Sequence, residues 1–184
     1  ILRPPVPPER ATGLSLLAAL AFARATEAEL GLETQLKWPN DGLIAGRKVC
    51  GILIELSAEV DRVHYAVCGT GINVNHTAKD FPAALRKTAS SLAIAAGRPV
   101  DRLAYYRRFL ATFEGVYREY RREGMSPILG EYRKCSILLG KKVTVRQGER
   151  KVTGTAVAID DTGALVVKTR SQEIVVRSGE ATLR

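Results

Sequence analysis

The residues best suited to chemistry in this sequence are a lysine and a short polar turn that precedes it. Residues 37–42 read Lys-Trp-Pro-Asn-Asp-Gly, and Lys48 stands just ahead of an apolar run. A lysine at the edge of a buried strand suits a phosphate or carboxylate ligand, because the low dielectric around it strengthens its field. Taken alone, Lys48 would more simply be a solvated lysine at a strand edge.

The polar turn itself has two interpretations that are compatible with each other. Pro-Asn-Asp-Gly is a good turn sequence, in which the side chains of Asn40 and Asp41 bond to their own backbone. A rigid turn would also position a ligand well. Lys37 could pair with Asp41 or reach a phosphate, whereas Trp38 is expected to be a packing anchor.

A second stretch, residues 68–75, reads Cys-Gly-Thr-Gly-Ile-Asn-Val-Asn and ends a further strand. A single Gly-x-Gly is a weak signal, because many strands end in this way. Gly69 and Gly71 lack Cβ atoms, so a ligand could approach the backbone closely there. Asn73 adds an amide to the same strand end.

Local patterns predict the elements that must position these residues. Apolar residues at three- and four-residue spacing indicate helices, with Thr12 as an N-cap and Gly31 as a C-cap of the first one. The expected elements are helices over residues 13–30, 90–96 and 101–123, a helical turn over 128–132, and strands over 34–38, 49–56 and 62–70. Residues 39–42 are expected to form a loop.

The sequence changes character from Ser136 onward. Four short apolar runs at 143–145, 153–159, 165–168 and 173–176 alternate with tight polar turns. Regular short strands joined in this way predict a small β-barrel.

Composition and charge exclude several classes of protein. The hydrophobic fraction of 46% and the charged fraction of 26% are those of an ordinary globular domain, and no run is long enough to cross a membrane. Arg3 and the prolines that follow it are not expected to form a signal peptide, and the three cysteines are expected to be reduced. The net charge of +9 is spread along the chain, which favours a solvated surface over a dedicated anionic partner.

The Lys-Trp-Pro-Asn-Asp loop, the Lys-x-x-Gly-Ile strand from Lys48 and the Gly-x-Gly-Ile-Asn strand together resemble the biotin protein ligase family. The resemblance implies an α+β fold: a mixed β-sheet flanked by helices, as in class II synthetases, followed by a small SH3-like β-barrel. It implies a biotin- and ATP-binding catalytic domain over 1–135 and a barrel over 136–184. Residues 139–143 and 163–165 are similar to the family's barrel sequence.

The resemblance also implies roles for single residues. In the family, the lysine that matches Lys48 contacts the biotin carboxylate and the α-phosphate of ATP. Asn40 and Asp41 match residues that hold the nucleotide phosphates and Mg²⁺, with Asp41 as the metal ligand. Lys37 is a further candidate for the phosphates.

The strand end and the C-terminus match further parts of the family's site. Gly69 and Gly71 match glycines that bring backbone against biotin, and Asn73 matches an amide offered to the adenine. Arg184 matches an arginine placed near ATP.

The implied reaction is the ATP-dependent formation of biotinyl-5′-AMP, followed by transfer of biotin to a lysine of a carboxyl-carrier domain. The resemblance thus implies ATP, Mg²⁺ and biotin as ligands, the carrier domain as partner, a cytoplasmic location and a possible homodimer. A lipoate ligase is the alternative enzyme. A non-catalytic remnant or binding module is the alternative of another class, although residues 136–184 contain no aromatic side chain with which to stack on bases.

One part of the family's pattern is expected ahead of Ile1. A strand and a Gly-Arg-rich loop of the form G-R-G-R-x-G-R grip biotin in the family, and the sequence starts after them. We therefore expect this chain to be an N-terminally truncated ligase that is weak or inactive alone, with an unpaired sheet edge. Some members of the family also carry a DNA-binding helix-turn-helix, which would lie ahead of Ile1, so the resemblance leaves a repressor role open.

Overall fold

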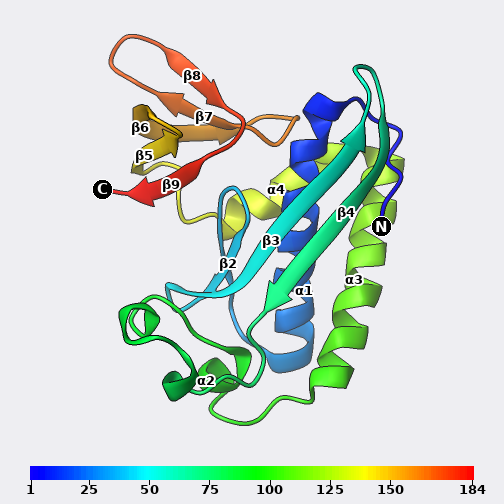
Figure 1. Cartoon of the computed structure of the whole chain (residues 1–184), viewed down its shortest axis with the longest axis vertical. Helices are drawn as coiled ribbons and strands as arrows, with labels where there is room; N and C mark the ends of the chain where they lie inside the picture. Colours follow the sequence, from blue (N-terminus) through cyan, green and yellow to red (C-terminus); the bar gives the residue numbers. More distant parts are fainter.

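The computed structural model describes residues 1–184, with the exception of the side chain of Thr12. Two units follow one another along the chain (Figure 1). The first contains a four-stranded sheet with helices, and the second is a five-stranded sheet. The elements of the first unit are η1 (Pro8–Gly13), α1 (Leu14–Leu30), β1 (Gln35–Lys37), β2 (Asp41–Ile44), β3 (Arg47–Ala58), β4 (Val63–Ile72), η2 (Ala78–Asp80), η3 (Ala83–Leu85), α2 (Leu92–Ala96), α3 (Arg102–Glu123) and α4 (Met125–Cys135).

Helix α1 is the centre of the first unit. It lies against one face of the sheet, beside α3 and α4 (Figure 1). Its residues from Leu14 to Ala23 are all buried, so the helix is enclosed on every side rather than along the single apolar face that the spacing predicts. It ends as expected at Gly31, whose φ of 65° lets its amide bond to the Glu27 carbonyl.

The start of α1 differs from the prediction. A 3₁₀ turn, η1, runs through Gly13, and α1 begins at Leu14 with Gly13 in the N-cap position. Thr12, the predicted N-cap, lies within η1, and its side chain is outside the described part of the chain.

The first sheet has the order β1-β2-β3-β4, and all its ladders are antiparallel. Among the residues that the structure describes, parallel pairing is confined to isolated bridges from Leu36 to Ser136 and from Lys48 to Ala89. Strand β2 was not predicted, because the polar turn was expected to continue through Gly42. Along the described chain, the outer edge of β4 carries only an isolated bridge from Ala66 to Leu2, together with one bond from Val63 to Val6, so the edge is largely unpaired as expected.

The second unit, residues 136–184, is an antiparallel sheet with the order β8-β7-β6-β5-β9. Its strands are β5 (Lys142–Gln147), β6 (Arg150–Ile159), β7 (Leu165–Lys168), β8 (Glu173–Val176) and β9 (Glu180–Leu183). The predicted barrel is not closed: β9 pairs with β5, and no ladder among the described residues joins it to β8. The division after residue 135 stays a prediction, and the end of α4 at Cys135 agrees with it.

Candidate functional site

A cavity of ≈ 1020 Å³ lies beside strands β2, β3 and β4. Five of the predicted site residues line it: Lys37, Asp41, Lys48, Gly71 and Asn73. They come from the ends of four strands and from the residue after β4. The antiparallel register brings them together, because Lys37 pairs with Asp41, Asp41 with Gly51, and Gly51 with Gly71.

Lys48 and Asp41 form an ion pair inside this cavity. The Lys48 Nζ lies 2.5 Å from Asp41 Oδ1, with 50% of the lysine side chain and 18% of the aspartate side chain exposed. Asp41 Oδ1 itself is buried and makes no hydrogen bond of good geometry among the described residues, so Lys48 is its charged partner. The ammonium is thus held at the wall of the cavity, with half of its side chain open to a ligand.

Lys48 is fixed by a segment that the sequence did not point to. Its amide donates to the Thr88 carbonyl at 2.7 Å, and the Ser90 amide donates to the Lys48 carbonyl at 2.8 Å. A register shift in β2 between Gly42 and Leu43 adjusts the pairing next to Lys48. The Lys48 side chain lies over Gly51, where a Cβ would be only 3.3 Å from Lys48 Cε, so the absence of a side chain at Gly51 leaves room for the lysine.

Asn73 holds the same segment from the other side. Its side-chain Nδ2 donates to the Ser90 carbonyl at 3.0 Å, and its backbone bonds to Val49 and Leu92. One N–H of this amide is therefore already used, and its second N–H and the side-chain oxygen stay available to a ligand. The glycines on the exposed face of the sheet, Gly51 and Gly71, present bare backbone to the cavity.

Three predicted residues do not line the cavity. Asn40 donates from Nδ2 to the Ile52 carbonyl at 2.8 Å and lines a smaller hollow of ≈ 170 Å³ with Trp38 and Pro39. Gly69 lies on the exposed face of β4, two residues before Gly71. Arg184 is exposed at the end of the second unit. A ligand role for these three, and the metal role of Asp41, stay predictions.

The second unit completes one wall of the cavity. Three residues of strand β9 line it: Glu180, Thr182 and Leu183. The loops after β4 supply Phe81, Leu85, Thr88 and Ala89. These residues lie far from the polar turn in the sequence, and no local pattern marks them.

Burial controls the chemistry of the thiol beneath the site. Cys50 is buried, and desolvation together with the nearby Asp41 charge raises the pKa of its thiol to about 12. Cys50, Cys68 and Cys135 are all free thiols, as predicted. Among the described residues no group of three or more His, Cys, Asp or Glu side chains could hold a metal ion by itself. None of the described helices is long and apolar enough to span a membrane.

Known proteins match the chain over both units. A model of the Biotin/lipoate A/B protein ligase family matches residues 2–73, and a model of the biotin protein ligase C terminal domain matches residues 138–184. The bifunctional ligase/repressor BirA of Bacillus spizizenii is 41% identical over 170 residues, which is 92% of this chain and 52% of that protein. The biotin–[acetyl-CoA-carboxylase] ligase of Mycobacterium tuberculosis is 32% identical over 171 residues, 91% of this chain and 60% of that protein.

Solved structures agree with these matches. The apo structure of biotin protein ligase from Aquifex aeolicus is similar with a TM-score of 0.83 and 28% identity, covering 96% of this chain and 76% of that chain. The complex of the Aquifex aeolicus protein with biotin and ATP has a TM-score of 0.80 and 28% identity, covering 94% and 71%. The chain spans about half the length of the BirA proteins that it matches.

Proposed function

Because the chain belongs to the biotin protein ligase family, we propose that its cavity binds biotin and ATP and forms biotinyl-5′-AMP. The observation that carries the proposal is the half-open Lys48 ammonium, held by Asp41 inside a cavity with backbone-lined walls. The full reaction would then transfer biotin to the lysine of a carboxyl-carrier domain. A cytoplasmic location and a homodimer stay predictions.

The proposed first step needs a fixed positive charge. The biotin carboxylate attacks the α-phosphorus of ATP, a carboxyl–phosphate bond forms, and pyrophosphate leaves with the electrons of the broken P–O bond. Negative charge develops on the phosphoryl oxygens, and an ammonium already aimed at them stabilises that charge more than it stabilises the substrates. Lys48 can do this when a ligand oxygen takes the place of Asp41 as its partner.

Asp41 fits a supporting role toward Mg²⁺. The ion usually binds through one or two carboxylates together with substrate phosphates, and Asp41 offers one carboxylate on the cavity wall. Lys37, its register partner on β1, lines the same wall and adds a second cation for the phosphates. Asn40 supports the turn from behind through its bonds to Ile52.

The match to the second unit favours biotin over lipoate. One family model covers both kinds of ligase, whereas the model that matches residues 138–184 describes the biotin protein ligase C terminal domain. The lipoate reading predicts the same adenylation with lipoate in place of biotin, so both acids belong in the test.

The test is adenylate formation from labelled biotin, ATP and Mg²⁺ by wild type, Lys48→Ala and the control Lys151→Ala. Lys151 is an exposed lysine of β6 outside the cavity, so its variant removes the same charge elsewhere. We expect Lys48→Ala to lower the rate by about 100-fold or more, the effect typical of losing one charge-stabilising contact, and Lys151→Ala to have no effect. Equal rates in the two variants would remove Lys48 from the mechanism. Wild type that neither binds biotin or ATP nor forms adenylate, even when the matching N-terminal segment of a biotin protein ligase is joined ahead of Ile1, would refute the proposed function.

A further inference from the structure

We propose that the loop between β6 and β7 in the second unit (residues 160–164) positions the turn between β1 and β2 (residues 38–40), and with it the Lys37 and Asp41 side chains. The contact that does this is a buried hydrogen bond from Trp38 Nε1 to the Gly163 carbonyl, 2.9 Å long. Trp38 and Gly163 are then positioning residues that act on the ligand site without touching a ligand. The consequence for ligand binding rests on the proposed function, whereas the contact itself does not.

The β6–β7 loop is rigid by itself. Asp160 Oδ1 accepts hydrogen bonds from the backbone amides of Thr162 and Ala164, at 2.9 and 3.0 Å, and from the Thr162 hydroxyl at 2.6 Å. The Gly163 amide donates to the Asp160 carbonyl at 3.0 Å. With its own polar groups satisfied in this way, the loop presents the Gly163 carbonyl outward in one fixed direction.

The loop is also fitted tightly to the first unit. It extends to the start of α1 (Figure 1). Gly163 has a φ of +87°, and a Cβ there would lie 2.8 Å from Gly13 Cα and 3.3 Å from Leu16 Cδ1. Only a residue without a side chain allows this approach.

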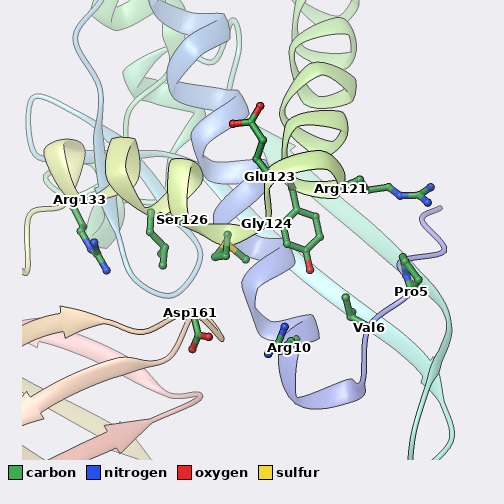
Figure 2. A pocket seen from close by; sticks show the side chains of 12 residues that line it. Pro5, Val6, Arg10, Arg121, Glu123, Gly124, Ser126, Arg133 and Asp161 are labelled. Carbon is green, nitrogen blue, oxygen red and sulfur yellow. The ribbon is translucent and has the colours of Figure 1, made fainter.

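A second bond holds the two units together beside the loop. The Arg133 guanidinium donates to the Ile159 carbonyl at 2.9 Å. A cavity of ≈ 570 Å³ lies between the units. Figure 2 shows Asp161, on the loop, at one side of this cavity, and Arg133 on α4 and Arg10 on η1 across from it. The loop therefore docks along the margin of this cavity at defined points.

The docked turn leads directly to the ligand site. Trp38 is 1% exposed, and it lies between Lys37, the last residue of β1, and Asp41, the first residue of β2. Ser15 donates to the Pro39 carbonyl, and Asn40 bonds to Ile52 through both backbone and side chain. The turn is thus held by α1, by β3 and by the second unit. Releasing one of these three attachments lets the paired ends of β1 and β2 move.

The test compares wild type with Gly163→Ala and with Gly148→Ala as a matched control. Gly148 also has a positive φ, +59°, in a turn of the second unit, but among the described atoms nothing lies within 4 Å of a Cβ there. Both variants place a side chain at a positive φ, and only in the first does the added Cβ meet the other unit. Trp38 is the single tryptophan of the chain, so its emission reports directly on the contact.

Three quantities are measured on each protein: the Trp38 emission maximum with acrylamide quenching, hydrogen–deuterium exchange of residues 41–44, and the dissociation constant of MgATP. We expect Gly163→Ala to shift emission to longer wavelength and to raise both the exchange rate and the MgATP dissociation constant by about tenfold, the factor for losing one buried hydrogen bond. Gly148→Ala should match wild type. If Gly163→Ala does not fold, Trp38→Phe keeps an aromatic six-membered ring at this position, removes the N–H donor and is judged by exchange.

The outcomes separate this proposal from the proposed function. The positioning role is overturned if Gly163→Ala has the same Trp38 emission as wild type. It is also overturned if the emission of Gly163→Ala shifts while the exchange of residues 41–44 stays unchanged. Equal changes in Gly148→Ala overturn it too, because they would reflect a general loosening of the second unit. If wild type does not bind MgATP, the proposed function loses its support, while the exchange of residues 41–44 still decides whether the loop positions the turn.

Discussion

Replacing Gly42 with alanine tests how tightly the polar turn is joined to the core. Gly42 follows Asp41 on β2, and a Cβ there would lie 2.6 Å from two ring carbons of Phe22 and 3.1 Å from Cys50 Cβ. Ordinary carbon contacts are about 3.5–4.0 Å, so the overlap with the ring is about 1 Å. Phe22 is completely buried within α1 and has no solvent into which to turn.

The magnitude follows from two opposing effects. Overpacking of a filled core lowers the free energy of unfolding by about 1–3 kcal/mol. Replacing glycine with alanine raises it by about 0.4–1 kcal/mol, because the unfolded chain becomes less flexible. We therefore expect Gly42→Ala to lower the free energy of unfolding by about 1–2 kcal/mol. Because the strain acts next to Asp41, ligand binding should weaken as well.

Urea unfolding followed by Trp38 fluorescence measures the effect, with two comparison proteins. Gly115→Ala, on the exposed side of α3 with nothing within 4 Å among the described atoms, should instead raise the free energy of unfolding by about 0.5–1 kcal/mol. A Phe22→Leu background should relieve part of the Gly42→Ala effect and give a coupling of at least about 0.5 kcal/mol. Unchanged stability in Gly42→Ala, or no coupling with Phe22, would refute the argument from ring overlap.

Two further predictions concern buried polar groups. The Tyr132 hydroxyl is buried without a hydrogen-bond partner among the described residues, and burial raises its pKa. Tyr132→Phe removes this unpaired group, so it should raise the free energy of unfolding, measured in urea, by about 1 kcal/mol. A decrease of that size would instead mean that the hydroxyl has a hydrogen-bond partner. The pKa of Cys50 is raised from 9.0 to about 12, so the stability that comes from keeping its thiol neutral is complete below pH 9 and is lost as the pH rises toward 12. Urea titrations at pH 8 and pH 11 should therefore show a larger loss for wild type than for Cys50→Ala, and equal losses would contradict the shift.

The elements with local signals were predictable from the sequence. Gly31 ends α1 in the left-handed conformation, Asp101 caps α3 by accepting from the amides of Leu103 and Ala104, and Gly124 ends α3. Each of these residues acts within one turn of the chain, so its type and position are enough. The apolar run of β3 was visible for the same reason.

Strand β2 was missed because its sequence looks like a turn. Asp41 and Gly42 are poor strand formers, and the strand exists because they pair with β3 and with β1. Its return turn, Ala45-Gly46, has positive φ at both residues, but it lacks the Asn-Gly or Asp-Gly sequence that usually reveals a hairpin. The site residues on β9 and in the 81–89 loops were missed because only the tertiary fold brings them to the cavity.

The predicted pair Asn40 and Asp41 shows why a binding motif cannot be read as a set of ligand contacts. The two residues are adjacent, and the start of β2 turns Asp41 into the large cavity while Asn40 bonds to Ile52 and lines the small hollow beside Trp38. Trp38 in turn bonds to the second unit. Each side chain of this stretch is therefore specified by a different neighbour, and only Lys37 and Asp41 line the ligand cavity. A substitution at Trp38 or Asn40 should thus weaken ligand binding by displacing Asp41, so a loss of activity there is not evidence of direct contact with a ligand.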